Sequence, residues 1–162
     1  MKKFTKTETK NLIIIFLILF VITEYNLLIS LRRGRDDVRK NDISAIENSL
    51  DTYLQKYKSY PLSTADGKII GCFESSPQID EKSGSPTNAV VCDWGKSKFE
   101  GENFMPQDPS FEKGASYYYV SDGREFDIFI SLEGKDEAEY TQVIADKRLQ
   151  CGTRICNYSK GN

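Results

Sequence analysis

The chain has 162 residues, with 22 basic and 24 acidic side chains and no histidine. Beyond residue 31 there are 18 basic and 22 acidic residues, a net charge of −4, and this balance argues against direct nucleic-acid binding, which needs a basic surface. The lack of histidine removes the commonest general base and the commonest metal ligand. We therefore expect neither an enzyme nor a bound cofactor, and the length allows one small domain plus an anchor.

Residues 1–31 are predicted to form a short cytoplasmic start and a transmembrane helix. Leu12 to Ile22 is an unbroken apolar run, and after a polar notch at Glu24 the run resumes as far as Leu31. About 20 residues of helix cross the hydrocarbon core of a bilayer. The alternative is a cleaved secretory signal, but such a signal ends in small residues, whereas large and charged residues follow Ile22. The Glu24 carboxylate either reaches the lipid headgroups or contacts a neighbouring subunit.

Basic residues mark the outer boundary of this span. Arg32, Arg33 and Arg35 are interpreted as a membrane-interface anchor beside lipid phosphates, with a contribution of about 1 kcal/mol per basic residue. The mixed charges that follow them also allow pairing between neighbouring subunits. Because lysines precede the span and arginines follow it, the positive-inside rule does not decide the orientation.

Residues 32–60 are predicted to continue the same helix as an amphipathic half. Apolar residues recur there at intervals of three and four, which places them on one stripe of the helix. The stripe consists of Ile43, Ile46, Leu50, Tyr53, Leu54 and Tyr57. Tyr60-Pro61 ends the helix, since the residue before a proline avoids helical angles. The stripe needs a sheet to cover it.

Four cysteines lie beyond the span, at Cys72, Cys92, Cys151 and Cys156. An even number on one side of a membrane segment favours disulfides in an oxidising compartment, which places the head outside the cytoplasm. Three connectivities are open. We favour Cys72–Cys92 and Cys151–Cys156 because each pair flanks a predicted loop. A zinc site is the less favoured alternative, since no CxxC pair is present.

Residues 61–162 are predicted to form a β-rich extracytoplasmic head packed on residues 38–58. Strands are expected at residues 68–73, 89–93, 115–120, 125–132 and 140–145. Asp122-Gly123 favours a tight hairpin turn between the third and fourth strands, because glycine accepts positive φ. Alternation in the fourth strand predicts one face that covers the helix stripe. That face consists of Phe126, Ile128, Ile130 and Leu132. The fold class is α+β, a long N-terminal helix packed on a small antiparallel sheet.

Several short motifs in this order resemble the type IV pilin and type II secretion pseudopilin family. Phe4-Thr5 with Glu8 resembles the family's Phe-Thr-Leu-Ile-Glu start, ahead of the apolar run. Residues 35–43 resemble its charged helix segment, R-D-x-x-R-x-x-D-I. Pro106-Gln107-Asp108-Pro109 resembles the Pro-Lys-Asp-Pro turn before the last hairpin, and Leu132-Glu133 resembles a pseudopilin strand end. The resemblance implies a pilin-like fold.

The resemblance also implies roles for individual residues. In the family, a prepilin peptidase cuts before the phenylalanine, so the processing site corresponds to Lys3 and Phe4. Lys3 stands where the family has glycine. Glu8 corresponds to the glutamate that pairs with the amine of a neighbouring subunit during assembly, because a carboxylate in an apolar bundle needs a partner.

The expected function is therefore that of a single-pass inner-membrane subunit with a cytoplasmic N-terminus. It would assemble through its helix, with homologous pilin or pseudopilin subunits and their assembly machinery, into a pilus, secretion or DNA-uptake filament. The alternative is a membrane-tethered extracytoplasmic binding module that keeps the pilin-like fold without assembling. The polar start of the chain and Lys3 favour this alternative.

Overall fold

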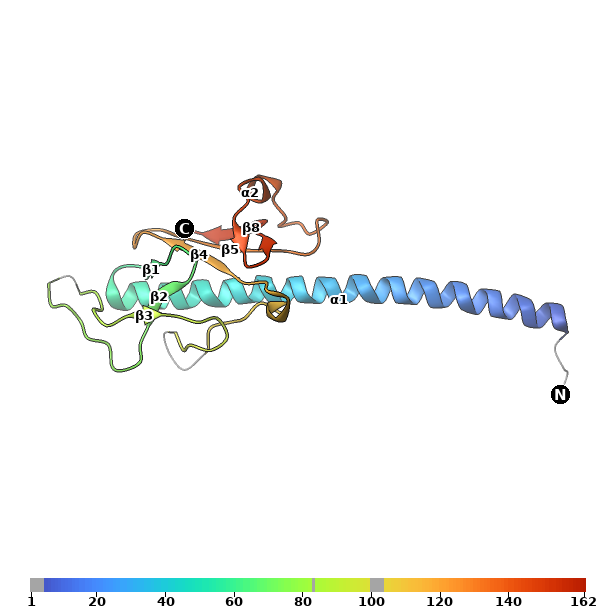
Figure 1. Ribbon diagram of the computed structural model, residues 1–162, viewed down its shortest axis with the longest axis horizontal. Coiled ribbons are helices and arrows are strands. Elements are labelled where there is room, and N and C mark those ends of the chain that lie inside the picture. Colours follow the sequence, from blue (N-terminus) through green and yellow to red (C-terminus); the bar gives the residue numbers. More distant parts are fainter. Residues whose placement is uncertain (1–4, 83, 100–103) are drawn as a thin grey trace.

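One continuous helix organises the molecule. The computed structural model describes residues 5–82, 84–99 and 104–162, and its helix α1 runs from Lys6 to Tyr57 over 52 residues (Figure 1). At 1.5 Å per residue, this is roughly 80 Å. Thr5 caps the helix start, and Lys58 ends it in a left-handed conformation at φ 62°. The helix is continuous, as predicted, but it ends at Tyr57, three residues before the predicted boundary at residue 60.

The two halves of α1 differ in what covers them. In the window of α1 that is apolar enough to span a membrane, no residue is buried by the rest of the chain. In the outer half, the head covers a face of the helix, and the buried residues follow the predicted spacing. Those residues are Asp36, Arg39, Ile43, Ile46, Leu50, Tyr53 and Tyr57. The head packs along the outer half of α1, while the apolar half projects from it (Figure 1).

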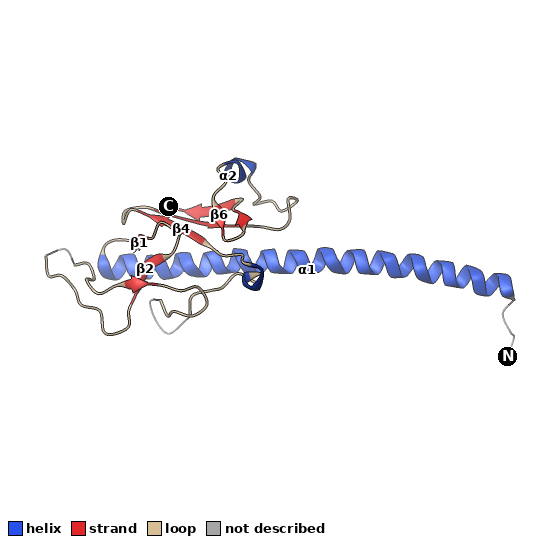
Figure 2. Ribbon diagram, in the orientation of Figure 1, coloured by secondary structure: helices blue, strands red, loops and turns tan. Residues whose placement is uncertain are grey.

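Two small antiparallel sheets and a two-stranded ribbon form the head (Figure 2). The first sheet has the order β1-β2-β3, with β1 at Leu62–Ser63, β2 at Ile69–Cys72 and β3 at Val90–Val91. The second has the order β4-β5-β8, with β4 at Tyr118–Ser121, β5 at Phe126–Ile130 and β8 at Tyr158–Gly161. The ribbon pairs β6, Gln150–Cys151, with β7, Arg154–Ile155. A 3₁₀ turn, Phe111–Lys113, precedes β4.

The predicted hairpin is present as β4 and β5, but its turn is longer than expected. Ser121 pairs with Phe126, so four residues form the connection instead of a tight two-residue turn. The Asp122 carboxylate accepts hydrogen bonds from the backbone N–H groups of Arg124 and Glu125, which stabilises the wider loop. Gly123 adopts φ 93°, the conformation for which glycine was expected.

The alternation in β5 divides the core as predicted. Phe126, Ile128 and Ile130 are buried in one cluster with the α1 stripe. Phe129, on the opposite face, packs in a second cluster with Cys151 and Cys156. The second sheet therefore joins the helix on one side and the C-terminal disulfide loop on the other.

The prediction of a strand at residues 140–145 is wrong. Residues Gln142–Asp146 form the short helix α2, because the N–H groups of Ile144 and Ala145 bond to the nearby carbonyl of Thr141. The place beside β5 is taken by β8, whose Tyr158 pairs with Ile130. No strand was predicted there, since the sequence Tyr158–Gly161 has no alternation of apolar and polar residues.

Candidate functional site

Arg39 lies at the centre of a buried ionic network between α1 and the head. Its side chain is fully buried, and its Nε and Nη2 donate to the two carboxylate oxygens of Asp108 at 2.7 and 3.0 Å. Nη1 donates to Asp36 at 2.8 Å, and Nη2 also reaches Glu133 at 3.1 Å. Burial alone would lower the pKa of Arg39, but the hydrogen bonds and charges of Asp108 and Glu133 reverse this effect and raise the pKa.

Asp36 joins this network to the backbone of the head. Its carboxylate oxygens accept from the N–H groups of Glu133 and Gly134, each at 2.9 Å, and from Arg39. A fully buried carboxylate is costly unless it is paired and hydrogen-bonded, and these three bonds meet that requirement. The segment after β5 is thereby held against α1 at Asp36, through the backbone of Glu133 and Gly134.

The Glu133 carboxylate accepts hydrogen bonds from three guanidinium groups. Arg35 donates to both of its carboxylate oxygens at 3.0 and 2.6 Å, and Arg154 and Arg39 donate to Oε1 at 3.0 and 3.1 Å. The hydrogen bonds from Arg35 are the largest cause that holds the pKa of Glu133 far below its usual range. With three arginines and three carboxylates, the network of Arg35, Asp36, Arg39, Asp108, Glu133 and Arg154 is electrically neutral; we call it the junction network.

The junction network unites segments that are distant in the sequence. Asp108 comes from the Pro-Gln-Asp-Pro turn, Glu133 from the segment after β5, and Arg154 from β7 inside the Cys151–Cys156 loop. Ser110 joins them, accepting from Arg39 at 3.0 Å. Because each carboxylate is already engaged by guanidinium or backbone donors, the chemistry of this arrangement is to hold the head in one orientation on α1.

A second group of ion pairs flanks the junction network on α1, with Arg32 and Arg33 on the side of the apolar half and Lys40 on the other side. Asp136 accepts from Arg32 at 2.5 Å and from Arg33 at 3.4 Å. Lys40 contacts Glu137 at 3.0 Å and Glu139 at 3.4 Å, and the Glu137 hydrogen bond is the main cause that raises the pKa of Lys40. Arg32, Arg33 and Arg35 thus pair with acids of their own head; their predicted contact with lipid stays a prediction.

Glu8 forms a capping box at the start of α1. Its carboxylate accepts from the Thr5 backbone N–H at 2.7 Å and from the Thr5 hydroxyl at 2.9 Å. These bonds satisfy a free donor of the helix terminus, and the Thr5 backbone bond is the main cause that lowers the pKa of Glu8. The predicted processing site, Lys3 and Phe4, lies outside the described residues.

The structure pairs Cys72 with Cys92 and Cys151 with Cys156, the connectivity favoured from the sequence. All four cysteines are therefore engaged in disulfides and are not zinc ligands. The first disulfide belongs to the main core, and the second lies beneath Phe129 in the smaller cluster.

The sequence motifs indicated most members of the junction network, but not their contact. Three separate motifs contain these members: the charged helix segment contains Arg35, Asp36 and Arg39, the Pro-Gln-Asp-Pro turn contains Asp108, and the Leu-Glu strand end contains Glu133. Arg154 and Ser110 belong to no recognised motif, and no sequence signal identifies them. Comparisons with protein-family models, with curated proteins and with solved structures give no match for this chain.

Proposed function

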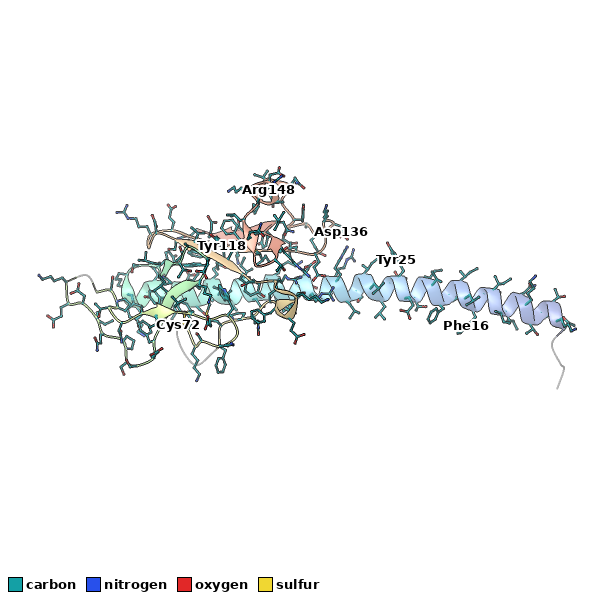
Figure 3. The ribbon with its side chains drawn as sticks, viewed as in Figure 1. Phe16, Tyr25, Cys72, Tyr118, Asp136 and Arg148 are labelled. Atoms are coloured by element: carbon teal, nitrogen blue, oxygen red, sulfur yellow. A yellow bond between two sulfur atoms is a disulfide. The ribbon has the colours of Figure 1, made fainter. Side chains whose placement is uncertain are left out.

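We propose that the chain is a membrane-anchored, pilin-like subunit that assembles into a filament through α1. The observation that carries the proposal is the large uncovered surface of this helix. Its apolar half is long enough to cross a bilayer and has no cover within the described chain. The labelled Phe16 and Tyr25 side chains project from the bare helix (Figure 3). In a membrane, lipid covers this surface; in a filament, the helices of neighbouring subunits do so.

The outer half of α1 also has a face that the described residues leave exposed, which supports assembly along the whole helix. Six exposed residues recur there at alternating intervals of four and three, the spacing of a helix–helix seam. They are Gly34, Val38, Asn41, Ala45, Asn48 and Thr52. The same spacing runs back through Leu31 and Leu27 into the apolar half. We call this stripe the helix seam.

Gly34 supports an interface on this face of α1, because no contact within the described chain requires a glycine at this position. A Cβ built at Gly34 meets no described atom within 4 Å. Glycine inside a helix costs about 1 kcal/mol relative to alanine, and the monomer gives no packing reason for this cost. Close approach of a neighbouring helix would give one.

The alternative function, a tethered binding module, has support from the other end of α1. Glu8 is engaged by Thr5 of the same chain, so its carboxylate is already satisfied without a neighbouring subunit. The head also carries a groove of about 440 Å³ at the end of α1, lined in part by Tyr53, Tyr60 and Arg124. We rank this function second because it leaves the helix seam without a role.

Site-specific photocrosslinking distinguishes the two functions. The full chain is expressed in membranes with a photoreactive side chain at Val38 or Ala45. This side chain should form adducts with a second copy of the chain or with a homologous pilin-like subunit. The same side chain at Lys147, an exposed position beside α2, is the matched control and should give none. Anchored protein without adducts at either seam position would contradict assembly and favour the tethered module.

A further inference from the structure

The helix seam continues into the inner part of α1, where it passes through one acid and one base. From Leu27 the same alternation of three and four residues leads back through Glu24 to Lys10. The positions between Lys10 and Glu24 are apolar, namely Ile13, Leu17 and Phe20. All positions of this stripe from Lys10 to Thr52 are exposed. A carboxylate and an ammonium group therefore share one face of the helix, within an otherwise uncharged stripe.

Glu24 has no base near it on its own helix. The sequence has no basic residue between Lys10 and Arg32, so none lies within one helical turn of Glu24. In the described part of the chain, neither Glu24 nor Lys10 takes part in an ion pair. An acid on a membrane-spanning helix is costly unless it reaches water or pairs with a base. The seam offers such a base only on another copy of the chain.

The spacing of the two charges matches the period of the seam. Fourteen residues separate Lys10 from Glu24, which is two repeats of the seven-residue period. At 3.6 residues per turn, this interval returns to within about 40° of the same face and spans about 21 Å. A parallel neighbour displaced by two repeats consequently keeps its seam facing the first helix. This displacement brings Lys10 of the displaced copy level with Glu24 of its neighbour.

The same displacement also matches other seam positions by size. Phe20 of the displaced copy comes level with Gly34 of its neighbour, so an aromatic ring meets a residue without a side chain. Leu17 comes level with Leu31, and Leu31 with Ala45. A Cβ at Gly34 meets no described atom of its own chain within 4 Å. The displaced neighbour thus provides the close contact that Gly34 lacks in the monomer.

Other parallel registers leave Glu24 without a base. Without displacement, the Glu24 carboxylates of two copies are level with each other, and like charges repel strongly where water is scarce. A displacement by one repeat places Glu24 level with Leu17 or Leu31. Two copies that both span a bilayer are in register. The favourable register therefore requires one copy to move outward by about 21 Å, as it does when it leaves the membrane for a filament.

We propose that Glu24 forms an ion pair with Lys10 of a second copy of this chain, displaced outward by two seam repeats. The pair sets the axial register between neighbouring helices, while repulsion between level Glu24 carboxylates opposes their association in the bilayer. This inference rests on assembly through α1 in the proposed function. It adds the identity of the partner, the contacting groups and the displacement between copies.

Disulfide trapping between two differently tagged copies measures the register. One copy carries Ile13→Cys and the other Leu27→Cys, which the two-repeat displacement places level. The full chains are coexpressed in membranes, and mild oxidation should give the mixed dimer. The native cysteines do not compete, because all four are engaged in disulfides. Two copies that both carry Leu27→Cys are the matched control and should give little dimer, since only helices in register bring that position together.

Charge variants test the ion pair itself. A polar contact between membrane helices changes association by about threefold to thirtyfold, so Glu24→Gln or Lys10→Gln should reduce the mixed dimer by that factor. Glu24→Lys combined with Lys10→Glu in both copies should restore it, because the charges are exchanged and the register is kept. Lys6→Gln is the matched control, since Lys6 comes level with Phe20 of the neighbour, and it should leave the yield unchanged.

Each outcome decides a different statement. If photocrosslinks from Val38 to a second copy persist without the mixed dimer, the register is overturned while assembly stands. Leu27→Cys dimers that increase with Glu24→Gln would show helices in register and overturn it as well. A mixed dimer that neither glutamine variant reduces refutes the ion pair. Loss of both the mixed dimer and the Val38 crosslinks contradicts the proposed function, and this inference with it.

Discussion

Arg39 and Asp108 form a bidentate ion pair with almost no exposure to solvent, across 69 residues of sequence. Such pairs combine two charge-assisted hydrogen bonds in a fixed geometry. Removing one partner leaves the other as a buried, unpaired charge, which is expensive.

Arg39→Ala should therefore destabilise the full chain by about 3–5 kcal/mol. Asp108→Ala should have a similar effect, and the double variant should lose less than the sum of the two. Urea unfolding in detergent, followed by the near-ultraviolet signal of the head, measures these differences. Arg33→Ala is the matched control, since its exposed ion pair contributes at most about 1 kcal/mol. Additive losses in the double variant would contradict a direct coupling.

The head should lose stability in acid through Glu133. The folded protein lowers the pKa of this carboxylate below its ordinary value of 4.5, mainly through the Arg35 hydrogen bonds. Its contribution is therefore fully present above the unfolded pKa of 4.5 and is lost as the pH falls below that value toward the folded pKa. Glu133→Gln should flatten this part of the stability profile.

The folded protein shifts the pKa of Asp42 in the opposite direction from that of Glu133. Burial is the largest cause that raises the pKa of this carboxyl, which receives a hydrogen bond from Tyr117. Its protonation favours the folded state as the pH falls, so Asp42→Asn should not remove the acid-induced loss. Unfolding curves at several pH values check both variants. A profile with Glu133→Gln as steep as that of the wild type would refute the assignment.

Each disulfide should stabilise the head according to the loop it closes. The sequence separations are 20 residues for Cys72–Cys92 and 5 for Cys151–Cys156. On the chain-entropy model, these loops correspond to about 3 and about 2 kcal/mol. Replacing both cysteines of a pair by alanine measures each term.

Removing the Cys151–Cys156 disulfide should lower the free energy of unfolding by more than its loop length suggests, because this loop holds Arg154 against Glu133. Arg154→Ala in the presence and absence of that disulfide separates the two contributions. Independent effects would show that the disulfide does not position Arg154.

Gly34→Ala should act in opposite directions on the monomer and on assembly. Alanine removes the glycine penalty and should stabilise α1 by about 1 kcal/mol, since a Cβ meets no described atom within 4 Å. The same methyl group would obstruct a closely packed neighbour, so photocrosslinks from Val38 should decrease. Gly34→Leu should decrease them further. Unchanged crosslinking in the leucine variant would place the interface elsewhere on α1.

Glu8 and Thr5 can be compared as a matched pair. If the capping box is the only role of Glu8, Thr5→Ala and Glu8→Ala should weaken the helix start equally, by about 1 kcal/mol, and leave crosslinking intact. The assembly role implied by the family resemblance predicts that only Glu8→Ala abolishes incorporation. Sequencing the N-terminus of the native protein gives an independent check, since a methylated Phe4 terminus would indicate peptidase processing.

The sequence alone determined the long helix, its division into two halves and the hairpin of β4 and β5. Each of these depends on local periodicity, which is visible wherever neighbouring residues share one environment. The apolar run ending at Leu31, the stripe from Ile43 to Tyr57 and the alternation in β5 are three such cases. The favoured cysteine pairing followed from loops in the same way.

Only the tertiary structure decided where the charges of α1 lie. The sequence interpretation placed the cluster after Leu31 at the water boundary, whereas Asp36 and Arg39 are fully buried. Their burial depends on partners about 70 to 100 residues away, at Asp108 and Glu133, and no local pattern encodes such a pairing. For the same reason β8 was missed and α2 was mistaken for a strand, since short elements take their conformation from long-range partners and not from their own periodicity.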